Sequence, residues 1–121
     1  MIAVEAPLHI AVLVSDLSRA EAFYGGLLQL EKVNRPMSFP GSWYQVGAFQ
    51  IHLIVAQGLQ KPLQNSEKWG RNPHLALAVK DLKAAKAVLV AAGYPVQLSA
   101  SGRAALFTQD PDSNVIEMSQ G

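Results

Sequence analysis

Apolar and polar positions along this chain follow a pattern that occurs twice. Residues 8–14 and 74–80 are short apolar runs rich in Val, Leu and Ile, and each is ended by an Asp-Leu pair. Such runs are typical of buried strands. Apolar residues then recur at helical spacing, between positions 17 and 28 in the first case and between 82 and 92 in the second. We therefore expect a strand followed by a helix at both places.

Capping residues indicate where the two helices begin and end. In the first helix, Ser18 and Glu21 have the spacing of a capping box. In the second helix, Asp81 is the expected N-cap. Gly93 then supplies a C-terminal cap, and Pro95 prevents the helix from continuing.

Three strand-like stretches follow each helix. They cover roughly residues 30–38, 42–47 and 50–56 in the first half, and roughly 95–100, 104–109 and 114–119 in the second. A tight turn near Gly47 and the turn over residues 110–114 each join the last two stretches of a half. The order βαβββ in each half predicts an α+β fold built from two βαβββ repeat modules.

The two halves also share sequence. At a shift of 65 residues, seven of the 17 positions in 8–24 are identical to those in 73–89. We expect module one to cover residues 7–56 and module two 74–119, with 57–73 as the linker. Neither half is long enough to fold comfortably alone, which favours one domain over residues 1–121.

The repeat places possible metal ligands at equivalent positions. His9 and His74 are related by the shift of 65, and the same shift relates His52 to Glu117. Because side chains alternate along a strand, each of the four points away from the bulky aliphatic face. On the first strands they share a face with small Ala side chains, which leaves space for a ligand.

A single His or Glu in a strand is usually a solvated or hydrogen-bonded residue. Four of them at two symmetry-related pairs of positions favour a shared metal site instead. Three imidazoles and one carboxylate suit a divalent ion such as Zn, Ni, Co, Mn or Fe. An octahedral ion with four protein ligands would keep two positions for water or substrate, whereas a closed tetrahedral Zn would be structural.

Composition narrows the classes of function. Charged residues make up 16% of the 121 residues, against roughly 25% in typical domains, and the net charge is +1. No basic face is present for nucleic acid, no apolar run is long enough to span a membrane, and no positively charged region of a signal peptide begins the chain. The absence of Cys excludes disulfides and thiol chemistry. We expect a cytoplasmic protein whose apolar excess forms a core and a subunit interface.

Together these features resemble the vicinal oxygen chelate superfamily, which includes glyoxalase I, fosfomycin-resistance proteins, methylmalonyl-CoA epimerase, extradiol dioxygenases and bleomycin-resistance proteins. Paired βαβββ units, a His on the first strand of each, and Glu117 in V-I-E-M after a D-P-D-x-N turn carry the resemblance. It implies a glyoxalase-like fold in which the modules form a curved mixed sheet, either within one chain or by exchange between two chains. It also implies that His9, His52, His74 and Glu117 hold a divalent metal and that the protein is a homodimer.

The family chemistry is chelation of adjacent substrate oxygens by the ion, with stabilisation of the oxyanion or enediolate that develops. The resemblance therefore implies a metal-dependent lyase or isomerase of the glyoxalase I type, with Glu117 as the catalytic carboxylate. No organic cofactor is evident in the sequence, and the need for a thiol cofactor is left open. The sequence departs from glyoxalase I at His52, where that enzyme has a carboxylate, and from many members at Ser113, where Gly is common. A small-molecule or antibiotic binding or resistance protein and a non-haem iron dioxygenase are the alternatives.

A few residues outside the ligand set are weaker candidates for the substrate site. Arg35 and Arg103 could bind a substrate carboxylate or phosphate through two hydrogen bonds, and Trp43 could form a cavity wall. Arg71 has the same capacity, but with Lys61 and Lys68 it forms a charge cluster that is solvated by default.

Overall fold

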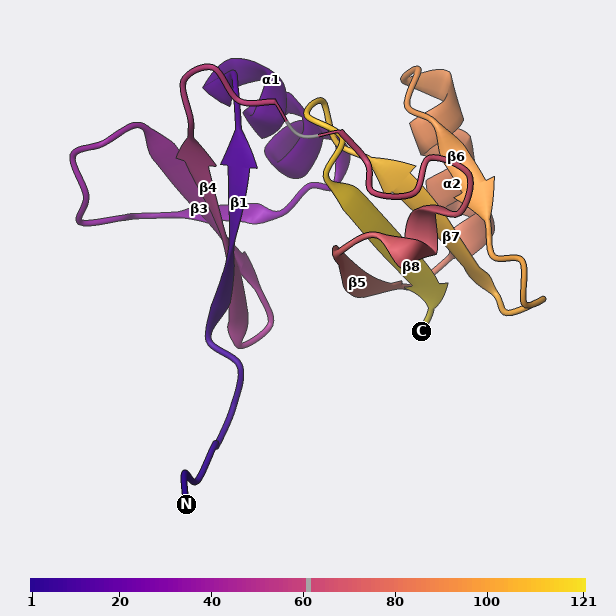
Figure 1. The fold of residues 1–121 in the computed structure, drawn as a ribbon, viewed down its shortest axis with the longest axis horizontal. Helices are drawn as coiled ribbons and strands as arrows, with labels where there is room; N and C mark the ends of the chain where they lie inside the picture. The colour runs from indigo at the N-terminus through magenta and orange to yellow at the C-terminus, as the bar shows by residue number, and fades with distance from the viewer. Residues whose placement is uncertain (61) are drawn as a thin grey trace. The chain divides into compact units, whose positions relative to one another are not determined.

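The computed structural model describes residues 1–60 and 62–121, so Lys61 of the predicted charge cluster lies outside the described residues. The chain divides into two compact units, Met1–Leu59 and Gln60–Gly121, which are described separately below (Figure 1). Each unit has a four-stranded mixed sheet with a helical segment after its first strand. The predicted α+β class with two βαβββ modules is thus confirmed.

The first unit contains six elements. They are β1 (His9–Val14), α1 (Leu17–Glu21), the π-helix η1 (Ala22–Leu27), β2 (Glu31–Val33), β3 (Gly41–Val46) and β4 (Phe49–Val55). The strand order is β1-β4-β3-β2, in which β1 runs parallel to β4 and the other neighbours are antiparallel.

The second unit repeats this arrangement. After the 3-10 turn η2 (Trp69–Arg71) come β5 (His74–Val79), α2 (Leu82–Ala91), β6 (Val96–Leu98), β7 (Ala105–Gln109) and β8 (Val115–Gln120). The strand order is β5-β8-β7-β6, with β5 parallel to β8. In each unit, the parallel pair consists of the first and the last strand of the unit, β1 with β4 and β5 with β8.

Strand alternation determines which face of each sheet is buried. In β1, Val12 and Val14 are buried, whereas His9 and Ala11 are exposed on the other face. The buried face packs against the helical segment, whose Phe23 is fully buried. The sequence pattern predicted this division, and it leaves the His-bearing face uncovered by the unit's own helix.

The helix ends differ from prediction in one place. The expected capping box is wrong, because Ser18 lies inside α1 and Asp16 is the N-cap, its Oδ1 accepting from the Arg19 backbone N–H at 3.0 Å. Asp81 is confirmed as the N-cap of α2, accepting from the Ala84 N–H at 3.1 Å. Gly93 ends α2 with a φ of +85°, a conformation that glycine adopts without strain.

The first helical segment is less regular than its counterpart. Its second part is a π-helix, in which the Leu28 N–H donates to the Phe23 carbonyl five residues earlier. A β-carbon at Gly25 would lie 3.0 Å from the Tyr44 hydroxyl, so Gly25 allows the helix to approach β3 closely. The expected strand over 30–38 shortens to β2, and Pro36, which cannot donate a ladder hydrogen bond, lies in the part that is lost.

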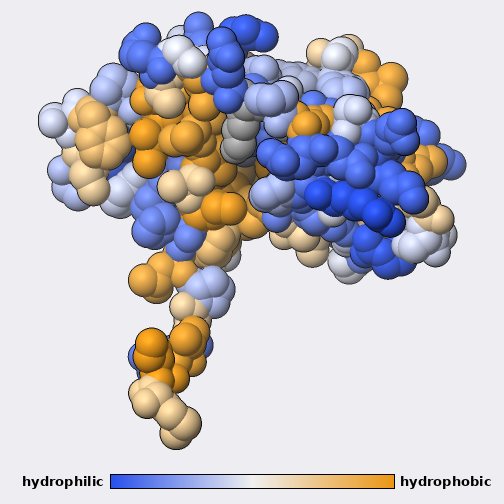
Figure 2. Space-filling model, in the orientation of Figure 1, coloured by the Kyte–Doolittle hydropathy of each residue, from blue (hydrophilic) through white to orange (hydrophobic). Residues whose placement is uncertain are grey.

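Apolar side chains also gather outside the core. The segment before β1 leads away from the sheet and exposes Met1, Ile2, Val4 and Leu8 (Figure 2). Within the described part of the chain, no helix has the length and apolar character needed to cross a membrane.

Candidate metal centre

Two of the predicted ligands meet in the second unit. His74 begins β5 and Glu117 lies within β8, where Ala76 is opposite Glu117 in the parallel register. This offset brings His74 Nε2 to 3.1 Å from Glu117 Oε1. The Glu117 residue is 7% exposed, so its carboxylate is largely withdrawn from water.

The backbone fixes which nitrogen of His74 faces Glu117. His74 Nδ1 is 2.7 Å from the carbonyl oxygen of Asn72. A carbonyl only accepts, so Nδ1 carries the proton and donates it. In the neutral imidazole, Nε2 then has a lone pair directed at a carboxylate oxygen. Two electron-pair donors this close are stabilised by a proton or a metal ion between them.

The spacing of this pair fits a metal ion. Two ligand atoms about 2.1 Å from an octahedral ion and at right angles to each other lie about 3.0 Å apart, a distance that a hydrogen bond also has. His74 Nε2 and Glu117 Oε1 are 3.1 Å apart. A carbonyl that holds the remote nitrogen of a ligand imidazole is also a usual second-layer contact in metal sites. Tautomer, distance and donor type therefore agree with a divalent ion at this pair.

The other carboxylate oxygen of Glu117 is held by two donors. Arg103 Nη2 donates to Oε2 at 3.1 Å, and the Ser119 hydroxyl donates to the same oxygen at 3.3 Å. Burial alone would raise the pKa of Glu117, but the hydrogen bond from Arg103, and the one that His74 makes when Nε2 carries a proton, outweigh burial and lower that pKa. Glu117 is consequently a carboxylate at neutral pH, which a metal ligand must be.

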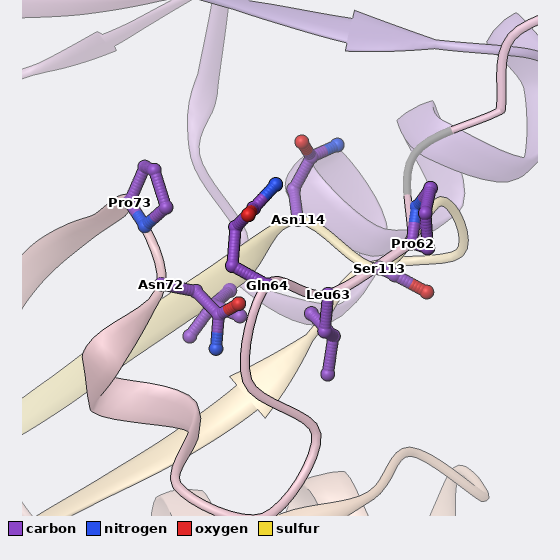
Figure 3. A pocket seen from close by; sticks show the side chains of 8 residues that line it. Pro62, Leu63, Gln64, Asn72, Pro73, Ser113 and Asn114 are labelled. Atoms are coloured by element: carbon purple, nitrogen blue, oxygen red, sulfur yellow. The ribbon is translucent and has the colours of Figure 1, made fainter.

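A loop and an aromatic ring position His74. The Asn72 amide ties this loop together, since its Nδ2 donates to the Asn65 and Trp69 carbonyls and its Oδ1 accepts from the Asn65 N–H. The same loop borders a cavity of about 110 Å³, lined also by residues 62–64 and the turn before β8 (Figure 3). The rings of Phe107 and His74 are perpendicular, with their centroids 5.5 Å apart.

The other two predicted ligands meet in the first unit. His9 begins β1, and Ala11 lies opposite His52 of β4, which is the same parallel offset as at the second pair. The rings of His9 and His52 stack with centroids 4.0 Å apart, and Trp43 stacks on His52 at 3.9 Å. These side chains border a cavity of about 270 Å³. Burial, and then the nearby charges of His9 and Arg35, lower the pKa of His52 and favour its neutral form.

Comparison with known proteins places the chain in a family. Residues 8–109 match the model of the Glyoxalase/Bleomycin resistance protein/Dioxygenase superfamily. The chain belongs to this superfamily. The resemblance to vicinal oxygen chelate proteins is thereby confirmed. A search of curated proteins gave no match.

Solved structures with the superfamily fold cover nearly the whole chain. A glyoxalase family protein from Bacillus anthracis is 23% identical with a TM-score of 0.79, over 98% of this chain and 96% of that one. Lactoylglutathione lyase from Agrobacterium tumefaciens is 22% identical with a TM-score of 0.70, over 96% and 93%. Fosfomycin resistance protein FosX from Mesorhizobium loti is 17% identical with a TM-score of 0.74, over 98% and 94%. At these identities the likeness shows the fold.

The structure brings the four superfamily ligand candidates together as two pairs, His9 with His52 and His74 with Glu117. Within residues 1–60 and 62–121, no group of three or more His, Cys, Asp or Glu side chains is close enough to hold a metal ion. A shared four-ligand site therefore stays a prediction.

The weaker candidates lie near these pairs. Trp43 stacks on His52, and Arg103 is paired with Glu117 rather than free for a substrate. Arg35 folds over its own loop, with Nη1 donating to the Phe39 carbonyl at 2.7 Å and the guanidinium 4.8 Å from the Phe39 ring. Its Nε and Nη2 are buried without a partner in the described part of the chain. A role of Trp43, Arg103 or Arg35 in substrate binding stays a prediction.

Sequence reasoning missed several residues that support the two pairs. Gln50 lies 2.8 Å from His52, Ser119 bonds Glu117, and Asn72 holds His74. Gln50 and Ser119 each lie two positions from a candidate ligand on the same strand. Polar residues at that spacing share the ligand's face, which is the signal that could have identified them.

Proposed function

We propose that this protein is a metal-dependent lyase or isomerase of the glyoxalase I type. His9, His52, His74 and Glu117, from one chain or from two chains that exchange modules, would hold a divalent ion (Zn, Ni, Co, Mn or Fe). That ion would chelate vicinal oxygens of a small oxygenated substrate. The observation that carries the proposal is the His74–Glu117 pair, whose 3.1 Å spacing and fixed Nδ1–H tautomer fit a metal ligand pair. Membership of a superfamily whose proteins typically use a divalent metal supports it.

Glu117 has the environment that the proposed chemistry needs. When bound, the ion supplies Lewis-acid stabilisation of the negative charge that develops on substrate oxygens. Arg103 and Ser119 hold Oε2, and this leaves Oε1 directed at His74. The lowered pKa keeps the carboxylate ionised, as a proton acceptor must be, although it also makes Glu117 a weaker base. In the proposal Glu117 accepts a proton from the carbon beside the oxygens that the ion would chelate.

A cavity in the second unit supports a small anionic substrate. It measures about 350 Å³, and its charged lining residues are Lys68, Arg71 and one carboxylate, Glu67, beside the apolar Leu98 and Phe107. Phe107 also contacts His74, so the cavity lies beside the proposed ligand pair. The side chains of Lys68 and Arg71 make no hydrogen bond or ion pair in the described part of the chain, so both cations are available to a carboxylate or phosphonate.

The same cavity supports the second candidate, a small-molecule or antibiotic binding or resistance protein. Binding an anion there needs no chemistry at Glu117, and the structural neighbours include fosfomycin resistance proteins. The non-haem iron dioxygenase is the third candidate, and a glyoxalase/dioxygenase from Nostoc punctiforme is among the structural neighbours. A cytoplasmic homodimer completes the proposal, with the exposed apolar N-terminal segment as support for the dimer.

A substrate panel on metal-loaded protein tests the proposed function. We expect turnover of a hemithioacetal or a CoA thioester, with loss of at least about 100-fold in Glu117→Gln. The control is Glu31→Gln, which removes an exposed carboxylate on β2. Binding of fosfomycin without turnover would favour the second candidate, and oxygen-dependent cleavage of a catechol with Fe(II) would favour the third. Full activity of Glu117→Gln would remove that residue as the proton acceptor.

A further inference from the structure

The β3–β4 hairpin carries two polar cross-strand pairs on the face of His52. Trp43 lies directly opposite His52, and Gln45 lies directly opposite Gln50. Because residues two apart on a strand share a face, both pairs belong to the same face of the sheet. The Gln pair therefore lies between His52 and the turn that begins at Gly47, where a chain of hydrogen bonds can connect them.

Backbone carbonyls set the direction of this chain. Gln45 Nε2 is 2.8 Å from the Gly47 carbonyl and 3.3 Å from the Phe49 carbonyl. Carbonyls only accept, so the amide nitrogen of Gln45 must face the turn and its oxygen must face Gln50. Gln50 Nε2 donates to that oxygen at 2.8 Å. The amide oxygen of Gln50 is then left to face His52.

This arrangement decides the tautomer of His52. Gln50 Oε1 lies 2.8 Å from His52 Nε2. An amide oxygen has no proton to give, so Nε2 carries the hydrogen, and in the neutral ring Nδ1 then carries the lone pair. His9 and Trp43 cover the two faces of the ring, which leaves its edge as the route to a ligand. Nδ1 has no hydrogen-bond partner in the described part of the chain, and His52 borders the 270 Å³ cavity.

We propose that Gln45 and Gln50 are positioning residues that hold neutral His52 as the Nε2–H tautomer, so that Nδ1 is the atom this residue offers to a ligand. His74 has the opposite tautomer, because the Asn72 carbonyl takes its Nδ1 proton. The two histidines thus present different nitrogens, at different distances from their strands. That the ligand is a divalent ion rests on the proposed function, whereas the tautomer rests on the amide chain alone.

Nitrogen-detected NMR of the metal-free protein at mildly alkaline pH tests this proposal, with His52 assigned by its loss in His52→Asn. We expect wild-type His52 to show one set of signals, with a protonated Nε2 and an unprotonated Nδ1. Gln50→Glu keeps an acceptor and should preserve that pattern. Gln50→Leu and Gln45→Leu should each give a mixture of tautomers. His74 is the internal control, and its Nδ1 should stay protonated in every variant.

Two results would overturn the proposal. One is wild-type His52 protonated mainly on Nδ1. The other is a Gln50→Leu protein, folded by its amide spectrum, that keeps the single wild-type pattern. Addition of Zn²⁺ separates the proposal from the proposed function. A change in the Nδ1 chemical shift on Zn²⁺ addition supports both the proposal and the proposed function. A Zn²⁺ bond at Nε2 overturns the proposal. If the protein has the expected tautomer but Zn²⁺ changes no His52 chemical shift, His52 is not a metal ligand. The positioning role of Gln45 and Gln50 then still stands.

Discussion

A methyl group at Gly70 would collide with the ring that contacts His74. A β-carbon built there lies 2.7 Å from Phe107 Cζ and 3.1 Å from Cε1, closer than ordinary van der Waals contact. Gly70 is not among the residues with positive φ, so its backbone would accept Ala and the conflict is purely steric. Phe107 is 8% exposed and meets the His74 ring at 5.5 Å, so its ring can yield toward the 350 Å³ cavity that it borders but not toward His74.

Overpacking of this kind costs about 1–3 kcal/mol, and we expect Gly70→Ala to lose that much free energy of unfolding. Urea unfolding followed by circular dichroism measures the loss. Gly26→Ala is the matched control, because no heavy atom lies within 4 Å of its added carbon. Gly26 lies in η1, where Ala should be neutral or stabilise by up to about 1 kcal/mol.

A double-mutant cycle with Phe107→Leu identifies the cause. The shorter side chain removes the ring atoms nearest to Gly70, so the added methyl should cost at least about 1 kcal/mol less in that background. A Gly70→Ala protein as stable as wild type would refute the steric argument. An equal cost of the methyl with Phe107 or Leu would show that it acts elsewhere.

Three further changes test individual contacts. Glu21 accepts hydrogen bonds from Lys32 and Ser42, and these lower the pKa of its carboxyl group. The ionised carboxylate therefore stabilises the fold at pH values above the unfolded-state pKa of about 4.3. This contribution is lost as the pH falls through the lower folded-state pKa. We expect Glu21→Gln to be less stable than wild type by under about 1 kcal/mol at pH 7, with the difference gone in urea titrations below the folded-state pKa of Glu21. Ser113 has a φ of +64°, so Ser113→Gly should raise the free energy of unfolding by about 0.5–1 kcal/mol. Removing the cap of α2 with Asp81→Ala should lower it by about 1 kcal/mol in the same assay.

The repeat in the sequence predicted the fold well because it fixes both strand alternation and strand offset. The faces of His9 and His74 followed from period-two alternation alone. The equivalence of His52 and Glu117 followed from the shift of 65, and both lie opposite an Ala of the first strand. Apolar periodicity also predicted both helical segments.

Contacts that depend on close approach could not be predicted in the same way. The π-helical turn arises where Gly25 meets Tyr44, and no local pattern announces that contact. The capping box at Ser18 was wrong because Asp16, two positions earlier, caps the helix in its place. The amide chain to His52 depends on the β3–β4 register, which periodicity leaves open by two residues.

Metal binding by the purified protein tests the central claim most directly. After removal and return of metal, we expect one divalent ion per chain by elemental analysis. The dissociation constant, measured by calorimetry, should rise at least about 10-fold in His74→Ala and in Glu117→Gln, because each removes one atom of the 3.1 Å pair. Glu31→Gln should bind as wild type does. A protein that holds no metal after reconstitution, or an affinity unchanged in both ligand variants, would contradict the account.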